Sequence, residues 1–393
     1  MRLGDCCKTN LHTYSDKEKW SLIRYLDTGS ITEGRIDEIQ TLYPGVDKIP
    51  SRARRKASVG DILFSTVRPN QKHYGIIEAG TENLLVSTGF TVVTVDTTIA
   101  DPYFIYYYLT QSSVIESLQA IAEQSTSTYP SIKPSDIEDI ELDLPALETQ
   151  KKIGSTLRML DRKIALNEEI NDNLQQQAAA LFESWFVNYD PWDGVQPSEW
   201  ENAPLGSFVE IKRGGSPRPI QDFLSDSGLR WLKISDVTSL SSPFVLEIKE
   251  HIKEEGLRKT VFLHAGELVL SNSATPGIPK ILDVDTCIHD GWLYFPKSEL
   301  SKYYLYLFFK HIRKELVALG NGSVFTNLKT DILKAFPATK ADESTLKEFD
   351  ALVTPLFDAM LNADRENFKL AAMRDALLPK LMSSEIDVSE VEL

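Results

Sequence analysis

Cysteine and histidine are scarce in this chain: its 393 residues include three cysteines and six histidines. Cys6 and Cys7 are adjacent and Cys287 is remote, so a disulfide framework cannot form. Nothing near them completes the Cys/His spacing of a metal site, and the histidines form neither an i,i+4 pair nor an HExxH motif. We therefore expect a reduced, cytoplasmic protein with no metal of its own.

Long apolar runs and a leader segment are also lacking. No run approaches the ~18–20 residues of a membrane span. The start, MRLGDCCKTN, lacks the basic and apolar regions of a signal peptide. Hydrophobic residues make up 42% of the chain, which excludes a disordered chain. The sequence predicts a globular protein of two or three domains that has no contact with a membrane.

Catalytic motifs are missing as well. There is no GxxxxGK[ST] phosphate loop and no glycine-rich loop after a strand that could hold S-adenosylmethionine. NYDPW at 188–192 partly matches the Asn/Asp-Pro-Pro-aromatic loop of amino-methyltransferases, but it lacks the second proline and follows a helix instead of a strand. We expect a chain with no catalytic residues, no metal site and no cofactor.

An internal repeat is the main positive feature, because residues 1–196 and 197–393 share short segments in the same order. The pairs are LGD at 3–5 with LGS at 205–207, VGDILFS at 59–65 with AGELVLS at 265–271, STGF at 87–90 with HDGW at 289–292, YFIYYYL at 103–109 with YYLYLFF at 303–309, and SIKPSDI at 131–137 with NLKTDI at 327–332. The chain is predicted to be two copies of one plan.

Each copy ends in a heptad-like series of mainly apolar residues, which we call the seam. Its steps alternate between four and three residues, the spacing of a coiled-coil face, and adding 196 to each position of the first series gives the second. The first series is Ile153, Leu157, Leu160, Ile164, Asn167, Asn171, Leu174, Ala178, Leu181 and Trp185, and the second is Phe349, Val353, Leu356, Met360, Ala363, Asn367, Leu370, Arg374, Leu377 and Leu381. The shared seam predicts two equivalent long helices.

These patterns predict a mixed α/β (α+β) chain. The expected parts are a first mixed domain (1–145), a long helix (146–187), a linker (188–199), a second mixed domain (200–338), a second long helix (339–382) and an acidic tail (383–393). Within the domains, 90–95 and 266–271 are predicted strands, whereas the tyrosine-rich stretches 103–119 and 302–319 are predicted helices. Pro355 should kink the second long helix.

The net charge of −15 argues against a nucleic-acid partner, but the charge is unevenly distributed. Residues 1–145 carry 14 basic and 20 acidic side chains, whereas residues 198–338 carry 17 of each. Both domains have basic clusters mixed with Asn, Gln, Ser and Thr, around the GDIL and GELV strands. Arg can bind guanine bidentately, and Asn or Gln can bind adenine.

We therefore expect DNA contacts from these clusters, with solvated charged loops as the alternative interpretation. The candidates are Arg52, Arg54, Arg55, Lys56, Arg68, Asn70, Gln71 and Lys72 in the first copy and Lys212, Arg213, Arg218, Arg258 and Lys259 in the second, together with the matching pair Lys133 and Lys329.

Taken in order, these segments resemble a known family. The series LGD, GDILFSTVRPN, STGF, YFIYYYL, SIKPSDI, LPALETQKKI and LDRKIALNEEINDNL is similar to the specificity subunit of type I restriction–modification systems, and the end RENFKLAAMRDALLPKLMSSEI is similar to the family's last helix. The resemblance covers nearly the whole chain. It implies two target-recognition domains that read a bipartite double-stranded DNA sequence, and two helices packed as an antiparallel coiled coil with internal pseudo-two-fold symmetry.

The resemblance also implies partners. The chain would be non-catalytic and would recruit two modification subunits, which methylate adenine with S-adenosylmethionine, and restriction/translocase subunits, which use ATP and Mg. We expect the modification subunits to dock on the helical pair, with Trp185, Phe186 and Trp192 as anchors; the alternative is that these aromatics pack the helix end against a domain. A duplicated scaffold or peptide-binding protein without a DNA role is the other hypothesis for the whole chain.

The seam carries asparagines near its middle. In an antiparallel pair, Asn171 and Asn367 should meet, with Asn167 close by, and should fix the register at a cost in stability. Because the register would set the spacing of the half-sites, four residues inserted near position 169 should lengthen the DNA spacer.

Overall fold

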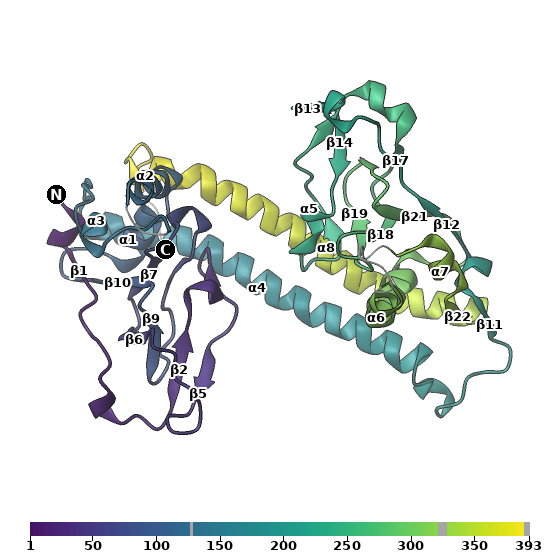
Figure 1. The fold of residues 1–393 in the computed structure, drawn as a ribbon, viewed down its shortest axis with the longest axis horizontal. Helices are drawn as coiled ribbons and strands as arrows, with labels where there is room; N and C mark the ends of the chain where they lie inside the picture. Colours follow the sequence, from purple (N-terminus) through teal and green to yellow (C-terminus); the bar gives the residue numbers. More distant parts are fainter. Residues whose placement is uncertain (126–128, 321–327, 389–393) are drawn as a thin grey trace. The chain divides into compact units, whose positions relative to one another are not determined.

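The computed structural model describes residues 1–125, 129–320 and 328–388. The chain divides into two compact units. Unit 1 comprises Met1–Lys163 with Leu370–Leu393, and unit 2 comprises Ile164–Lys369. Each unit contains one mixed domain and segments of both long helices, α4 (Leu147–Phe186) and α8 (Glu343–Met382) (Figure 1). Within the expected tail 383–393, residues 389–393 lie outside the described residues.

Unit 1 is built on two four-stranded sheets. The first has the order β1 (Cys7–Thr9), β10 (Phe90–Val95), β7 (Ile62–Ser65), β8 (Tyr74–Ile76), and the second β5 (Gln40–Leu42), β2 (Ile23–Leu26), β9 (Leu84–Ser87), β6 (Ala53–Lys56). A short hairpin, β3 (Ile31–Thr32) and β4 (Arg35–Ile36), accompanies them. The helices of this domain are α1 (Pro102–Leu109), α2 (Ser112–Glu123) and α3 (Pro134–Glu138).

Unit 2 has two five-stranded sheets. The first has the order β12 (Val209–Arg213), β21 (Trp292–Ser298), β18 (Leu268–Ser271), β19 (Pro279–Leu282), β15 (Phe244–Val245), and the second β13 (Leu224–Ser225), β16 (His251–Ile252), β14 (Leu229–Leu232), β20 (Thr286–Ile288), β17 (Val261–Leu263). A further pair joins β11 (Glu201–Pro204) to β22 (Pro337–Lys340). The helices of this domain are α5 (Ser235–Thr238), α6 (Lys302–Gly320) and α7 (Thr330–Ala335).

The strands of the two unit 1 sheets have equivalents in the same order in unit 2, as the repeat predicts, and unit 2 adds β15 to the first sheet and β13 to the second. The segments GDILFS and GELVLS form the equivalent strands β7 and β18, and each is flanked by the strand that follows its STGF or HDGW turn, β10 or β21. In the second sheets, the parallel pair β2–β9 corresponds to the parallel pair β14–β20. The mixed α/β fold in two copies, each followed by a long helix, is confirmed.

The tyrosine-rich stretches differ from each other. The expected helix 302–319 is the single helix α6, but the expected helix 103–119 is divided into α1 and α2. Gln111 is extended at the break, with φ −60° and ψ 138°. The neighbouring Thr110 carries a hydroxyl that donates to the carbonyl of Tyr107 at 3.2 Å, a local bond that competes with continued helix.

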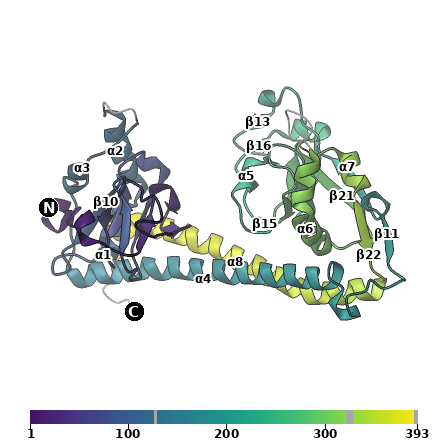
Figure 2. The ribbon, with the colours of Figure 1, turned by 60° about the horizontal axis from the view of Figure 1, so that its bottom comes forward.

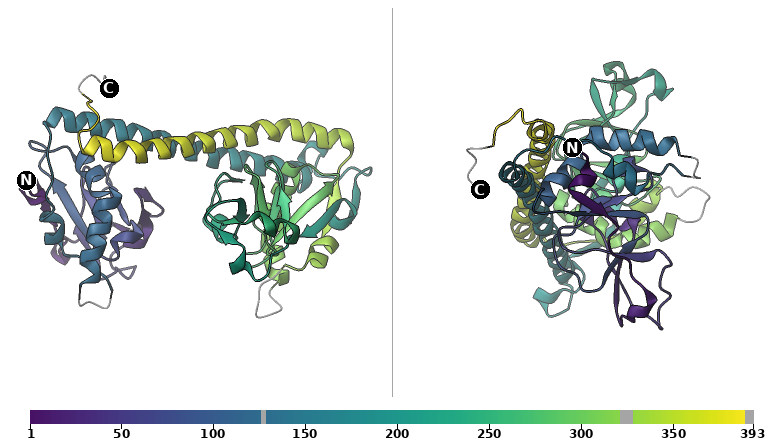
Figure 3. Two further views of the ribbon diagram at one scale, coloured as in Figure 1. Left: turned by 90° about the horizontal axis from the view of Figure 1, so that it is seen from above. Right: turned by 90° about the vertical axis from the view of Figure 1, so that its left-hand side faces the viewer.

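The long helices are antiparallel where they pair inside each unit. In unit 1 Arg374 contacts Asp161, and in unit 2 Asn367 contacts Asn167; Figure 3 shows the helices side by side. Helix α8 continues through Pro355, where a kink was expected, and it is anchored on either side by the buried Val353 and Phe357.

Each unit buries its own part of the seam. Ile153 and Leu157 lie in the core of unit 1, together with the tyrosine-rich helix α1. In unit 2, Phe349, Val353 and Met360 pack in one core with α6, which also contacts the strands (Figure 2). Burial of apolar side chains from both helices and a domain holds the helix segments of each unit in place.

Candidate nucleic-acid interface

A turn after the second sheet organises the basic loops of unit 1. This turn, 87–90 (STGF), receives two backbone contacts: the N–H of Thr88 donates to the carbonyl of Arg52 at 2.9 Å, and the N–H of Thr66 donates to the carbonyl of Gly89 at 2.8 Å. Arg52 precedes β6, and Thr66 begins the loop that carries Arg68. The turn therefore brings together two basic clusters that are separate in the sequence.

The loop with Arg68 is held in a defined shape. Arg68 and Lys72 have left-handed φ values of 49° and 57°, on either side of a 3-10 turn at Pro69–Gln71. The Arg68 guanidinium lies 5.3 Å from the centroid of the Tyr129 ring, and the backbone N–H of Arg68 donates to the carbonyl of Pro130 at 3.0 Å. Asn70 and Gln71 are exposed. This loop can present polar side chains to a ligand.

The β6 cluster is less exposed. Lys56 forms an ion pair with Glu18 and lies 5.1 Å from the Trp20 ring, and Arg54 lines a cavity of about 410 Å³ beside the same ring. Arg55 is half-buried, and desolvation lowers the pKa of its guanidinium. Of this cluster, Arg52 is the exposed side chain.

Unit 2 repeats the arrangement around the turn 289–292 (HDGW). The N–H of Asn272 donates to the carbonyl of Gly291 at 2.8 Å, which corresponds to the Thr66–Gly89 bond of unit 1. The Thr260 hydroxyl, next to Lys259, donates to the carbonyl of Ile288 at 2.9 Å. The same kind of turn thus gathers basic residues in both units.

The matching lysines occupy equivalent places. Lys133 and Lys329 are exposed and stand at the starts of α3 and α7. The residue before each donates its backbone N–H to the strand-end residue: Ile132 to Thr66 at 2.8 Å, and Leu328 to Asn272 at 2.7 Å. Each lysine is therefore adjacent to the loops that the turn organises.

Two arginines of unit 2 converge on one carboxylate in this turn. Arg218 lies 3.2 Å from Asp290 (Nη2 to Oδ2), and Arg213 lies 3.9 Å from the same oxygen. The hydroxyl of Ser216 donates to the other carboxylate oxygen at 2.6 Å. This Ser216 hydrogen bond, followed by the two arginines, lowers the pKa of Asp290.

The other predicted lysines and Arg258 are placed differently. Lys212 pairs with Glu210 at 2.9 Å and lines a separate cavity with Lys297, whereas Lys72 pairs with Glu33. Arg258 and Lys259 end a 3-10 helix at Glu254–Lys259, where Lys259 lies 4.8 Å from the Phe223 ring.

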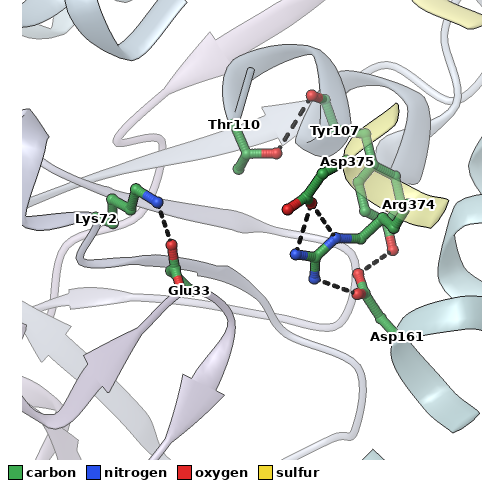
Figure 4. A network of polar contacts seen from close by, with 7 residues as sticks. All are labelled: Glu33, Lys72, Tyr107, Thr110, Asp161, Arg374 and Asp375. Carbon is green, nitrogen blue, oxygen red and sulfur yellow. Dashed lines mark hydrogen bonds and ion pairs between the residues drawn. The ribbon is translucent and has the colours of Figure 1, made fainter. Parts of the chain in front are cut away.

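A polar network joins the long helices to the domain of unit 1 (Figure 4). Arg374 donates to Asp161 at 2.8 Å and to Asp375 at 2.8 Å, and the Tyr107 hydroxyl donates to Asp161 at 2.6 Å. Burial, and then the Asp161 carboxylate, raise the pKa of Tyr107, so its hydroxyl stays a donor. The network lines a cavity of about 430 Å³ that also includes Lys72. Its members fix helix segments to the domain.

All three expected asparagines make contacts between the helices, but Asn167 and not Asn171 is the one bonded to Asn367. Asn167 donates to Asn367 at 2.8 Å, whereas Asn171 donates to Asp364 at 2.7 Å. Asn171 and Asn367 are equivalent positions, and such positions meet only on the two-fold axis of a helix pair. The partner of Asn367 is therefore the asparagine that lies four residues, about one helical turn, before the equivalent position Asn171.

The three candidate anchor aromatics pack within unit 2. Phe186 is buried, and its ring centroid lies 4.8 Å from that of Phe349. The ring centroids of Trp185 and Trp192 are 5.8 Å apart, and those of Trp192 and Trp200 are 4.8 Å apart. This geometry matches the alternative interpretation, in which they attach the end of α4 to the domain.

Some relevant residues were absent from the predicted set. The predicted set did not include Asp290; its position in the HDGW turn between two basic segments was the available signal. The exposed apolar side chains Leu166, Ile170 and Phe368 on the long helices in unit 2 were also missed. The helical periodicity locates them outside the seam.

Among residues 1–125, 129–320 and 328–388, no group of His, Cys, Asp and Glu side chains is arranged to hold a metal ion. Within the same ranges, no helix combines the length and the apolar character that crossing a bilayer requires.

The fold and this site define a duplicated α/β chain whose domains each present basic loops around one turn. A family model described as the type I restriction modification DNA specificity domain matches residues 49–176 and 197–339. The chain belongs to this family.

Individual relatives agree with the assignment. The chain is 25% identical to the type I restriction enzyme HindI specificity subunit of Haemophilus influenzae, over 98% of each chain. It is 24% identical to the MjaIX specificity subunit of Methanocaldococcus jannaschii, over 84% of this chain and 79% of that one. A solved type I restriction–modification S subunit from M. genitalium has the same fold, with a TM-score of 0.60 and 16% identity over 97% of this chain and 95% of that one.

Proposed function

We propose that this chain is the non-catalytic subunit that selects the DNA sequence for a type I restriction–modification complex. Unit 1 and unit 2 would each read one half of a bipartite target in double-stranded DNA. The observation that carries the proposal is the equivalent turn, STGF or HDGW, which gathers basic and amide-bearing loops in both units. Membership in the DNA specificity family supports it.

The chemistry would be supplied by partners. Two modification subunits would methylate adenine with S-adenosylmethionine, and restriction/translocase subunits would cut DNA with ATP and Mg. This chain would contribute no cofactor and would act in the cytoplasm, where the host DNA is accessible. Relatives of this chain bear names of type I restriction enzymes, which supports the assignment to such a complex.

The modification subunits would dock on the long helices. Trp185, Phe186 and Trp192 are engaged in packing, so we assign the contact to exposed apolar side chains instead. Leu166, Ile170 and Phe368 in unit 2 have exposed fractions of 54%, 50% and 50%. Apolar and aromatic side chains left exposed on an otherwise polar helix surface favour a protein partner.

A duplicated scaffold without a DNA role is not favoured, because the family is defined by DNA specificity. The two functions differ in their dependence on salt. DNA binding weakens steeply with salt as counterions are released, whereas binding of a protein in an apolar groove does not.

The decisive experiment is a map of adenine methylation in the host with and without the gene. We expect loss of one methylated motif made of two short half-sites. An unchanged methylation map, in cells that contain active modification subunits, would refute the proposal.

A further inference from the structure

The turn 289–292 of unit 2 contains a carboxylate that the equivalent turn of unit 1 lacks. Asp290 stands where Thr88 stands in the first copy. Its backbone is as involved as its side chain: the carbonyl of Asp290 accepts a hydrogen bond from Arg213 Nε and another from Asn272 Nδ2, the latter at 3.4 Å. Asp290 is therefore connected to β12, to the loop that follows it and to the end of β18.

Two glycines allow this close approach. A Cβ atom on Gly214 would lie 2.2 Å from the carbonyl oxygen of His289, and one on Gly215 would lie 3.1 Å from that of Lys259. The backbone after β12 is thus pressed against both the turn and the 3-10 helix that ends at Lys259. With larger residues here, Ser216 and Arg218 could not reach Asp290.

The ion pairs at Asp290 contribute little to stability. The side chains of Arg213, Arg218 and Asp290 are 52%, 78% and 38% exposed, and solvent screens the attraction within exposed ion pairs. Their effect is on geometry. A guanidinium has five N–H groups in a planar fork, and the contacts to Asp290 leave most of those on Arg218 free to face a ligand.

A groove opens beside this cluster. It has a volume of about 910 Å³, and its lining includes Arg218, Gln221, Lys233, Ser273 and His289. Donors and acceptors of this kind match the edges of base pairs. Trp231 and Ile220 provide apolar surface in the same groove, which suits the methyl group of thymine.

The carboxylate also determines which part of DNA fits. Asp290 would repel a phosphate placed against Arg213 and Arg218, so the pair is poorly suited to the backbone. An arginine held by a carboxylate is suited to the O6 and N7 atoms of guanine, because its fork is fixed before DNA binds and less side-chain freedom is lost on binding.

We propose that Asp290 is a positioning residue for the half-site of unit 2. Its carboxylate, which also contacts Arg213, holds Arg218 so that the Arg218 guanidinium can read a guanine. This inference rests on the proposed function and extends it to a named base contact. Because unit 1 has Thr88 at the equivalent place, the effect of Asp290 is confined to one half-site.

The test uses the full chain in complex with its modification subunits. The complex methylates a plasmid library in which both half-sites are randomised, and sequencing gives the preference at each base. The variants are Asp290→Asn, which removes the charge, and Arg218→Lys, an exposed substitution that keeps a positive charge but loses the fork. Glu299→Gln is the matched control, since the 57% exposed Glu299 forms an ion pair with Lys340 in the same unit and does not line the groove.

Both variants should lower the preference for guanine at the same position of one half-site by about tenfold. They should leave the other half-site unchanged, and Glu299→Gln should match the wild type at every position. Equal loss of methylation at all sequences, or unchanged base preferences in both variants, would overturn the role of Asp290. A wild-type complex without any two-part motif would instead refute the proposed function itself.

Discussion

The Asn167–Asn367 pair of unit 2, in which Asn167 is buried and Asn367 half-buried, gives a quantitative test of how the helices keep their register. Asn167 is 2% exposed and donates to Asn367 and to Glu366, each at 2.8 Å. Asn367 donates in turn to the carbonyl of Ile164 at 3.3 Å. We consider the replacement of Asn167 and Asn367 by leucine, singly and together.

The two substitutions should be strongly coupled. Each hydrogen bond between the helices contributes about 0.5–1.5 kcal/mol, whereas burial of a leucine contributes about 1.5–3 kcal/mol. In the double variant both amides are gone, so its free energy of unfolding should rise by about 1–2 kcal/mol. Asn167→Leu alone leaves the Asn367 oxygen without that donor, at a cost of about 1–3 kcal/mol, which cancels most of the gain.

The measurement is urea unfolding of the wild type, both single variants and the double variant, analysed as a double-mutant cycle. We expect a coupling energy of about 1 kcal/mol or more. The double variant should also methylate sites with more varied spacers, because leucines permit alternative registers. Additive single effects, or a double variant less stable than the wild type, would contradict the reasoning.

Three further predictions concern other residues. Arg374→Leu should lower the free energy of unfolding of unit 1 by about 2 kcal/mol, because Asp161 loses a charged partner. The control Lys151→Leu, which removes an exposed ion pair with Glu148, should cost less than about 0.5 kcal/mol. Hydrogen exchange of α1 and the end of α8 would measure both effects, and equal effects would contradict the prediction. Lys280 is buried, and desolvation lowers its pKa to about 7. Between about pH 7 and 10 the unfolded chain therefore binds more protons than the folded chain, so this lysine should make the free energy of unfolding rise with pH. Lys280→Met should flatten the rise of the urea midpoint across this window. Phe368→Ala should weaken binding of the modification subunit about tenfold in a titration without lowering thermal stability, and undiminished affinity would place the docking surface elsewhere.

The repeat made the fold predictable. Aligned segments such as VGDILFS and AGELVLS located equivalent strands, and the shared offset of 196 residues located both helices, because periodicity in sequence follows directly from burial on one face. The break after Leu109 was not predicted, because no proline or glycine marks it in the stretch 103–119.

The sequence predicted which segments carry the candidate site, but not which contacts their side chains make. Basic residues around the GDIL and GELV strands could be identified by composition. Which of them are already paired depends on residues far away in the chain: Glu18 for Lys56, Glu33 for Lys72 and Asp290 for Arg218. That Asn167 and not Asn171 bonds Asn367 has a similar origin, because a heptad pattern defines the face of a helix but not its axial position against a partner.

These pairings explain how a chain with a net charge of −15 is compatible with DNA recognition. Much of the positive charge in the basic loops is neutralised by nearby carboxylates, so long-range attraction to phosphate is weak. Arg218 keeps most of its N–H donors available while Asp290 holds its guanidinium. Such a surface gains little from nonspecific DNA and depends on matching base edges, which is the behaviour required of a subunit whose role is to select a sequence.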